Sequence, residues 1–380
     1  MKLAGPWLNR EETQGVCAML TMAGHQALVV GGAVRNALLG MAVVDIDLAT
    51  DARPEQVVAL AAAAGLRAVP TGIDHGTVTV VANGLPYEVT SFRRDLATDG
   101  RHAVVGFGAT LAEDAARRDF TMNALYAQAD GTVIDPLGGL PDLLARRVRF
   151  VGDPAARIAE DYLRILRFFR FYATHGDPAN GPDAEGLAAC AAGLGGLDGL
   201  SRERVGAEMR KLLAAADPAP AVAAMVSCGV LGHVLPGADA GALAVLVHLE
   251  AGVPPGWLRR LVVLGGDDPA QALRLSRAES RGWVLLRDMI GGAEGPGELA
   301  YRHGAELARD VLLLRGAVFE ADLPDHWQRT LATGAAAQFP VAAVDLMPGL
   351  QGPALGTRLA ELEAAWIASA FTLSRADLLA

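Results

Sequence analysis

Hydrophobic positions follow two different spacings along the chain, and the change comes near residue 150. Before it, short apolar runs such as 28–30 and alternating runs such as 77–81 are typical of strands and lie between stretches of helical spacing. From residue 155 onward strand signals nearly vanish, and apolar residues recur at helical intervals between Gly, Pro and Asp. The pattern predicts an α+β protein in which a mixed head precedes an all-helical body and tail.

The spacing also predicts individual elements. Asn83-Gly84 separates two alternating runs and indicates a hairpin, and Asp130-Gly131 indicates a second tight turn. Residues 93–110 are rich in charge and turn residues, so we expect a mobile surface loop there. The expected helices of the head are 9–24, a short one closed by Gly40, 57–64 (capped by Thr50 or Asp51 and ended by Gly65) and 111–126; the expected strands are 28–30, 44–48, 77–81 and 87–90.

Beyond the head, helical spacing continues without a fixed repeat period. We expect each helix to end at the Gly, Pro or Asp that interrupts the spacing. The predicted helices are 155–172, 185–192, 201–216, 219–228, 240–249, 257–264, 270–275, 279–290, 298–315, 323–333 and 356–371.

The chain is organised around the stretch 28–48. A buried strand leads into Gly31-Gly32 and a short helix, and free backbone N–H groups at such a helix start are a place where phosphates bind. In the strand that follows, Val44, Ile46 and Leu48 are expected on one face, which leaves the acidic residues between them on the other. A phosphate site followed so closely by an acidic pair indicates nucleotide chemistry.

That acidic pair is Asp45 and Asp47. Two carboxylates on one strand face repel each other unless a cation lies between them. Mg²⁺ is the natural candidate, because it takes oxygen ligands and is usually shared with substrate phosphates. Glu88, on the returning strand of the hairpin, is either a third carboxylate of this site or an edge-strand charge that faces solvent.

A second informative stretch is the helix predicted over 155–172. Its helical wheel places Arg164, Arg167 and Arg170 on one side, and the i, i+3 spacing places Asp161 beside Arg164. A carboxylate accepts from an exocyclic amine and a guanidinium donates to ring nitrogens and carbonyls, so this pair matches the edge of cytosine or adenine. The other two arginines suit a triphosphate. The alternative is an ordinary amphipathic helix with a surface ion pair, worth about 0–1 kcal/mol.

Composition and charge limit the possible partners. With 380 residues, two or more domains are expected. The net charge of −10 argues against nucleic acid, but the arginines cluster before residue 175, and local charge decides where a polyanion binds. Three scattered cysteines without CxxC spacing predict neither disulfides nor a zinc site. No apolar run reaches transmembrane length and residues 1–7 hold no apolar signal core, so we expect a cytoplasmic protein with no membrane contact.

These motifs together resemble the class II tRNA nucleotidyltransferase/poly(A) polymerase family. The matches occur in order over most of the chain, and a later helical motif, Ser201–Glu208, and the tail residues Asp345-Leu346 and Gly352-Pro353 extend them. The matching runs are Gly31-Gly32-Ala33-Val34-Arg35, Asp45-Ile46-Asp47, Arg117-Arg118-Asp119-Phe120-Thr121 and Glu160-Asp161 with Arg164 and Arg167.

The resemblance implies a fold and a set of site residues. It implies a polymerase-beta-like nucleotidyltransferase head over 1–150, a helical neck over 151–235 that recognises the base and binds RNA, and a helical, tRNA-binding body and tail over 236–380. Asp45 and Asp47 would hold catalytic Mg²⁺. The nucleotide-binding residues that it implies are Gly32, Arg35, Arg118, Asp161, Arg164, Arg167 and Arg170.

The sequence departs from the family at Asn36. The family usually has Asp after the Arg of its glycine motif, so a charge is lost here. We expect function to survive if that position only orients Arg35 or the turn.

The implied activity is the addition of C, C and then A to the 3′ end of tRNA from CTP and ATP, by two-metal transfer with release of pyrophosphate. Relatives that add only CC lack a head loop, and residues 94–101 are similar to that loop, which favours complete CCA addition. Partial CC- or A-addition and poly(A) polymerisation share these motifs, although poly(A) polymerases often carry a basic extension and this sequence is acidic up to Ala380. A non-catalytic RNA-binding protein is the alternative from another class.

Overall fold

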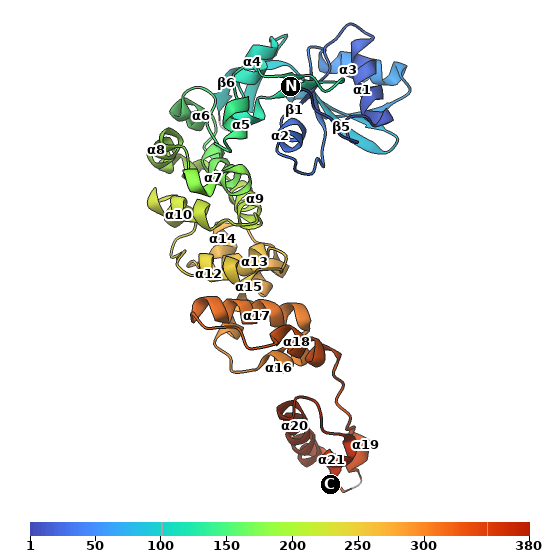
Figure 1. Cartoon of the computed structure of the whole chain (residues 1–380), viewed down its shortest axis with the longest axis vertical. Coiled ribbons are helices and arrows are strands. Elements are labelled where there is room, and N and C mark those ends of the chain that lie inside the picture. The colour runs from blue at the N-terminus through green and yellow to red at the C-terminus, as the bar shows by residue number, and fades with distance from the viewer. Residues whose placement is uncertain (100–101, 348) are drawn as a thin grey trace. The chain divides into compact units, whose positions relative to one another are not determined.

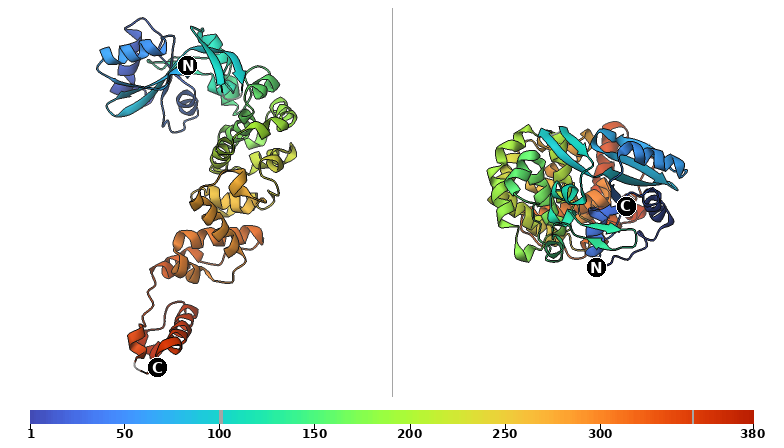
Figure 2. Two further views of the ribbon diagram at one scale, coloured as in Figure 1. Left: turned by 180° about the vertical axis from the view of Figure 1, so that it is seen from behind. Right: turned by 90° about the horizontal axis from the view of Figure 1, so that it is seen from above.

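The computed structural model describes residues 1–99, 102–347 and 349–380, with residues 74, 95–99 and 102–105 described by their backbone alone. The chain divides into two compact units, Met1–Val234 and Leu235–Ala380 (Figures 1 and 2). No helix in the described part of the chain is both long enough and apolar enough to cross a bilayer.

The core of the first unit is a seven-stranded sheet. Its order is β3 (Arg67–Gly72), β4 (Thr77–Ala82), β5 (Leu85–Ser91), β2 (Asp47–Thr50), β1 (Leu28–Val30), β8 (Tyr126–Gln128) and β9 (Val133–Ile134). The pair β2–β5 is parallel and every other neighbouring pair is antiparallel. β1 and β2 therefore lie inside the sheet, with partners on both edges.

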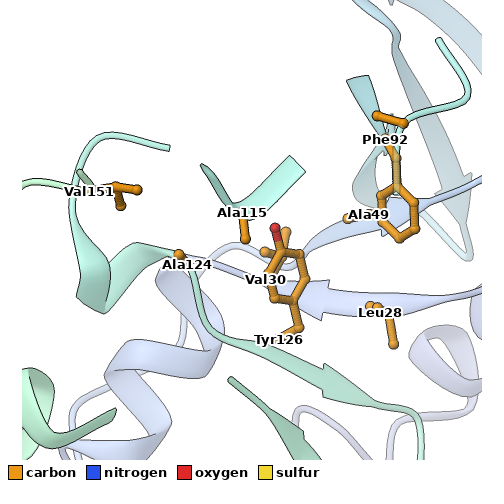
Figure 3. Packing of buried hydrophobic residues seen from close by; sticks show 9 residues of the cluster. Leu28, Val30, Ala49, Phe92, Ala115, Ala124, Tyr126 and Val151 are labelled. Atoms are coloured by element: carbon orange, nitrogen blue, oxygen red, sulfur yellow. The ribbon is translucent and has the colours of Figure 1, made fainter. Parts of the chain in front are cut away.

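Side chains of the central strands pack on both faces of this sheet. On one face, α1 (Glu11–Thr21) and α3 (Pro54–Ala63) pack on each other and on β4 (Figure 1). On the other, Leu28 and Val30 of β1 pack with Phe92, Tyr126 and the short helix α4 (Leu111–Ala116) (Figure 3). The sheet head further contains α2 (Gly32–Leu38), α5 (Leu140–Leu144) and the 3-10 turns η1 (Ile73–His75) and η2 (Thr121–Asn123).

Helices complete the first unit. Its longest helix, α7 (Leu163–His175), packs against α9 and α10, while α6 packs against α8. The bounds of the others are α6 (Pro154–Glu160), η3 (Pro178–Asn180), α8 (Ala184–Ala192), η4 (Leu194–Gly199), α9 (Arg202–Leu213), α10 (Ala219–Ser227) and α11 (Val230–Val234).

The second unit is helical throughout its described residues. Near its end, Trp366 and Leu362 pack with Val341 and Leu378 to form a separate apolar cluster. Its helices are α12 (Leu243–Leu249), α13 (Trp257–Leu264), α14 (Pro269–Ala272), α15 (Arg277–Ile290), α16 (Pro296–His303), α17 (Ala305–Val318), α18 (Trp327–Ala336), α19 (Ala343–Leu346), α20 (Gly352–Ala368) and α21 (Arg375–Leu379).

Several predicted elements are confirmed. The structure has the α+β organisation, the helix within 9–24, and the hairpin whose turn residues Asn83 and Gly84 both have positive φ, at 48° and 82°. Gly40 and Gly65 follow their helices in the left-handed region, where a glycine is not strained.

Two predictions for residues 93–126 are wrong. The expected loop is a two-stranded ribbon of β6 (Arg93–Asp99) and β7 (His102–Phe107) (Figure 2), and Gly100 and Arg101 lie outside the described residues. The expected helix 111–126 ends at Ala116, and the chain enters β8 at Tyr126. Helical spacing misled here because the apolar residues between 120 and 127 are buried on every side, so their burial follows the sheet rather than one helix face.

Three further details differ from the prediction. The strand 44–48 begins only at Asp47, and Val44 is 82% exposed instead of sharing a buried face with Ile46 and Leu48. α3 starts after Arg53, whose N–H donates to Gln56 at 2.8 Å, so neither Thr50 nor Asp51 caps it. The helix 155–172 is two helices, because Asp161 adopts an extended backbone (φ −155°) between α6 and α7.

A buried ionic cluster joins three helices of the second unit. Glu250 accepts from Arg259 Nε at 2.7 Å and from Arg260 Nε at 2.9 Å, and the side chains of all three residues are at most 3% exposed. Arg259 also contacts Asp310 of α17 at 2.5 Å. Because charges taken from water need close partners, the carboxylate of Glu250 is essential to both guanidinium groups.

We predict that Glu250→Gln lowers the free energy of unfolding of the second unit by about 3 kcal/mol, because it leaves buried positive charge without its main counter-ion. Urea denaturation of the full chain measures the loss. The matched control is Glu298→Gln, which breaks the partly exposed pair with Arg302 on α16 and is expected to cost less than about 1 kcal/mol. An equal loss of unfolding free energy in the two variants would contradict the claim that burial makes the Glu250 carboxylate the more important one.

Candidate active site

The glycine turn lies where β1 passes into α2. Gly31 has φ 66°, which a residue with a side chain rarely adopts, and its N–H donates to the carbonyl of Leu125 at 3.2 Å. A Cβ atom on Gly31 would lie 3.7 Å from Nη1 of Arg118. Gly32 is the first residue of α2. The turn therefore brings its backbone close to an arginine from a distant part of the chain.

The acidic residues lie on the strands next to this turn. Asp47 pairs with Val30 of β1 on one side and with Glu88 of β5 on the other. Burial, together with the nearby carboxylates of Glu88 and Asp45, raises the pKa of Asp47 to about 6, against the attraction of Arg118. Asp45 is exposed and precedes the strand. Since β5 lies between β4 and β2, Glu88 is not on an edge strand, but its side chain is exposed, so that part of the alternative is confirmed.

The residues present suit a divalent cation in their chemistry. Burial is the main cause of the raised pKa of Asp47, and repulsion from Glu88 and Asp45 adds to it; a cation relieves that repulsion. Their hard oxygen atoms are ligands that Mg²⁺ prefers. Within residues 1–99, 102–347 and 349–380, no three acidic, histidine or cysteine side chains are close enough together to enclose an ion.

Arg35 is buried beside the glycine turn and is held by two asparagines. Its Nε and Nη2 donate to the side-chain oxygen of Asn36 at 3.1 and 3.0 Å, and Nη1 donates to that of Asn123 at 2.5 Å. Burial lowers the pKa of Arg35 to about 10, with attraction from Asp119 and repulsion from the neighbouring arginines acting in opposite directions. Arg35 thus stays charged at neutral pH while its direct partners are neutral.

Asn36, at which the sequence departs from the usual motif, bonds to Arg35 and to the segment before Asp45. Its carbonyl oxygen orients Arg35, and its amide group donates to the carbonyl of Ala42 at 3.1 Å, on the segment that leads to Asp45. A carboxylate accepts the first two bonds equally well but donates none. The amide therefore orients the arginine and also fixes the segment.

A cavity of about 310 Å³ opens between α4 and the helices α7 and α9. Its lining is strongly charged, with five arginines and two aspartates. Four residues predicted to bind nucleotide line it, namely Arg118, Asp161, Arg164 and Arg167, and the others are Arg117, Asp119, Leu163 and Arg204. The cavity therefore brings together residues from three separate motifs. Gly32, Arg35, Arg170 and the two aspartates of the acidic pair do not line it.

Asp161 lies beside Arg164 as expected, since the N–H of Arg164 donates to the carbonyl of Asp161 at 3.0 Å and both residues line the cavity, but the surface ion pair of the alternative is absent among the described residues because each side chain has another partner. Asp161 accepts from the N–H of Leu163, the first residue of α7, at 3.1 Å, and its other oxygen accepts from Arg204 at 2.7 Å. Arg164 donates through Nη1 alone, to Glu160 at 2.5 Å and to the carbonyl of Arg157 at 2.8 Å. The helix breaks at Asp161, whose short side chain competes with the helix for backbone N–H groups, so its carboxylate bonds to Leu163 and Arg204.

Arg167 and Arg170 have carboxylate partners from different elements. Arg167 donates through Nε and Nη2 to Asp119, and Asn123 donates to the other oxygen of that carboxylate at 2.9 Å. Burial raises the pKa of Asp119, but Arg167 and the hydrogen bonds outweigh it, so the pKa lies below its usual value. Arg170 donates to Glu208 of α9 at 2.5 Å and lies 4.4 Å from the centre of the Phe171 ring.

Three residues of this network were not predicted from the sequence to belong to the site. Arg204 contacts Asp161 across 43 positions of sequence, and no local spacing indicates that contact. Asp119 belongs to the Arg117–Thr121 motif and Asn123 follows it. The motif therefore indicated that both lie near the site, but it did not predict their hydrogen-bond partners.

Parts of the chain match two family models. Residues 27–149 match the poly A polymerase head domain, and residues 185–241 match the probable RNA and SrmB-binding site of polymerase A. Mitochondrial CCA tRNA nucleotidyltransferase 1 of Danio rerio is 33% identical over 372 residues, which cover 92% of this chain and 85% of that protein. Its similarity thus extends through both units.

Two other relatives are similar over different lengths. The human mitochondrial CCA tRNA nucleotidyltransferase 1 is 42% identical over 217 residues, 56% of this chain and 50% of the human protein, so the match spans about half of that relative. The crystal structure of the Bacillus stearothermophilus CCA-adding enzyme in complex with CTP superposes with a TM-score of 0.75 at 29% identity, covering 96% of this chain and 94% of that one.

Proposed function

The chain belongs to the family of CCA-adding tRNA nucleotidyltransferases, and we propose that it adds C, C and then A to the 3′ end of tRNA from CTP and ATP, with release of pyrophosphate. The observation that carries the proposal is the 310 Å³ cavity, in which Asp161 and Arg164 lie among four further arginines. An acceptor and a donor suit a base edge, and the surrounding positive charge suits a triphosphate.

Base selection is proposed for Asp161 and Arg164. Each oxygen of Asp161 has one protein donor and keeps acceptor capacity for an exocyclic amine. Nε and Nη2 of Arg164 donate to no described residue and are available to a ring nitrogen or carbonyl. Cytosine and adenine both offer an amine beside a ring acceptor, so one pair of side chains serves both bases, and no nucleic-acid template is needed.

Charge neutralisation is proposed for the remaining site residues. Arg118 and Arg167 line the cavity and face the phosphates, while Gly32 and Arg35 contact the triphosphate or ribose from the glycine turn. Arg170 donates through Nε to Glu208, so within the described residues its two terminal nitrogen atoms are left for the nucleotide. Positioning and charge neutralisation are the main contributions that a protein makes to nucleotidyl transfer.

We propose that Asp45 and Asp47 hold Mg²⁺ and that Glu88 is an acidic neighbour on the next strand, whose charge acts on Asp47. When bound, the metal supplies a lowered pKa for the 3′-hydroxyl and charge stabilisation for the leaving pyrophosphate. Asp47 lies on the central strand β2, opposite the last residue of β1 before the glycine turn. Asp45 precedes this strand and is exposed. Arg118 lies close to Gly31 and its positive charge acts on Asp47, so an acidic and a basic group lie near the same turn.

The proposal extends to domain roles and location. We assign the head to 1–150, the neck to 151–235 and the body and tail to 236–380, with tRNA bound by the helical parts. The free thiols of Cys17, Cys190 and Cys228 suit a reducing compartment, and we propose the cytoplasm.

The test of the function uses the purified chain and tRNA primers that end at the discriminator base, at C and at CC, each with labelled CTP or ATP. We expect CTP incorporation on the first two primers, ATP incorporation on the third, and a stop after the A. Unlimited A-tailing would indicate a poly(A) polymerase, addition of C or A alone would indicate a partial enzyme, and binding of tRNA without incorporation would indicate a non-catalytic protein.

We predict that Asp45→Ala lowers incorporation at least about 1,000-fold, since a bound metal supplies several kcal/mol of transition-state stabilisation. Binding of tRNA, measured by filter retention, is expected to stay within about twofold, because positive charge dominates nucleic-acid affinity. Glu55→Ala, on the exposed face of α3, is the control and should retain activity. Retained CTP incorporation by Asp45→Ala would contradict the assignment of Asp45 as a metal ligand.

We predict that Asp161→Ala weakens the selection of CTP and ATP over UTP and GTP, whose bases have a carbonyl where cytosine and adenine have the amine, more than it slows turnover. The ratio of kcat/KM for the correct over the incorrect nucleotide is expected to fall about tenfold or more, the usual value of one specific base contact. Single-nucleotide incorporation on each primer measures that ratio. An unchanged ratio counts against a role of Asp161 in reading the base.

Substitutions at Asn36 separate its two hydrogen-bonding roles. Asn36→Ala removes both, and we expect the KM for CTP to rise about tenfold, in line with hydrogen bonds to a charged group. Asn36→Asp keeps the two acceptors for Arg35 and is expected to stay within about threefold of the parent. Steady-state kinetics on the primer that ends at the discriminator base distinguish the variants. If Asn36→Asp were as weak as Asn36→Ala, the bond to Ala42 would be the important one.

A further inference from the structure

Tyr126 occupies a position in the first unit where a buried hydroxyl meets two charged groups. Its O–H donates to Asp114 Oδ2 at 2.7 Å and accepts from Arg118 Nε at 3.0 Å. Arg118 Nη2 donates to the same oxygen of Asp114 at 3.0 Å. Figure 3 shows the ring of Tyr126 in the apolar cluster, with its hydroxyl oxygen toward the side of Ala115, the neighbour of Asp114.

The guanidinium group held in this way faces the candidate active site. Nη1 of Arg118 lies 3.7 Å from the place that a Cβ atom of Gly31 would take, and it donates to no described residue. The positive charge of Arg118 also acts on Asp47, and its side chain lines the charged cavity. The sheet register explains this position, because Tyr126 and Asp47 flank the same residue of β1, Val30.

We propose that Tyr126 is a positioning residue, which with Asp114 fixes Arg118 so that Nη1 meets the phosphates of the incoming nucleotide. The inference rests on the proposed function and adds a residue that acts through Arg118. Two nitrogen atoms of the guanidinium are tied on one edge, so its plane cannot turn freely, and the third is left for the ligand. Fixing a group before binding reduces the entropy lost when the nucleotide arrives.

The hydroxyl suits this task better than a second carboxylate. Asp114 already serves two arginines, because its Oδ1 accepts from Arg117 Nε at 2.9 Å while its Oδ2 binds Arg118. One acid between two bases leaves net positive charge on this side of the cavity. A neutral hydroxyl adds a second orienting bond to Arg118 without reducing that charge, and burial raises the pKa of Tyr126, which keeps the hydroxyl protonated.

Tyr126 also contributes to the core, so the test must separate packing from positioning. Tyr126→Phe keeps the ring in the apolar cluster and over the Arg118 guanidinium, whose carbon lies 5.2 Å from the ring centre. Tyr87→Phe is the matched control. Tyr87 is a buried tyrosine of β5 in the same unit, and its hydroxyl is hydrogen-bonded to Thr13 at 3.1 Å, on the face of the sheet that carries α1.

The experiment measures the dissociation constant of CTP by calorimetry, without tRNA, on the full chain. We expect Tyr126→Phe to weaken CTP binding about tenfold, the usual effect of losing one hydrogen bond to a charged group. Tyr87→Phe is expected to stay within about twofold. In a background of Arg118→Lys, adding Tyr126→Phe should change the dissociation constant less than about twofold, because the residue through which Tyr126 acts is already altered.

The outcomes distinguish this inference from the proposed function. Equal CTP affinity of Tyr126→Phe and the parent, with a thermal shift like that of Tyr87→Phe, would make Tyr126 a purely structural residue. Full additivity with Arg118→Lys would also overturn the inference. A parent chain that binds CTP but extends no tRNA would refute the proposed function and leave the inference intact, whereas a parent that binds no CTP would refute both.

Discussion

The ion pair between Asp119 and Arg167 is the contact on which the candidate site depends. Asp119 follows α4 at the edge of the sheet head, and Arg167 lies on α7, so the pair joins the two parts of the first unit that enclose the cavity. The same carboxylate accepts from Asn123, which in turn accepts from Arg35 beside the glycine turn. A buried carboxylate is stable only with such partners. One network therefore connects the helix of the proposed base-reading residues with the proposed phosphate site.

The polar groups of the cavity have protein partners before any nucleotide binds. Asp161 is bonded to Arg204, and Arg164 to Glu160, so each group proposed to read the base is oriented by a neighbour and not left unpaired. This arrangement avoids the cost of unsatisfied buried charge and still leaves one acceptor or donor edge for a ligand. Arg35 is likewise oriented by protein partners. They are neutral asparagines, so its positive charge is not cancelled.

Local patterns in the sequence predicted the parts of the site that lie within one element. The glycine turn, the hairpin after Asn83 and the arginine face of α7 follow from spacing and turn chemistry alone. Contacts between distant residues did not follow from spacing. A continuous helix and a helix broken at Asp161 have the same residue spacing. The break occurs where the Asp161 side chain accepts from the first N–H of α7, and spacing does not reveal that bond. The pairing of β6 with β7 depends on contacts between the two strands. The charged and turn-forming residues of this segment gave no sign of strands in the sequence.

The central claim is that this cavity, formed by Asp161, Arg164 and the surrounding arginines, receives the nucleotide. A crystal structure of the chain with bound CTP tests it most directly. The account predicts cytosine in the cavity, with its amino group donating to Asp161 and its ring acceptors facing Nε or Nη2 of Arg164, while the triphosphate extends toward Arg118 and the glycine turn. CTP bound elsewhere, with the bonds of Asp161 to Arg204 and of Arg164 to Glu160 unchanged and no base in the cavity, would contradict it.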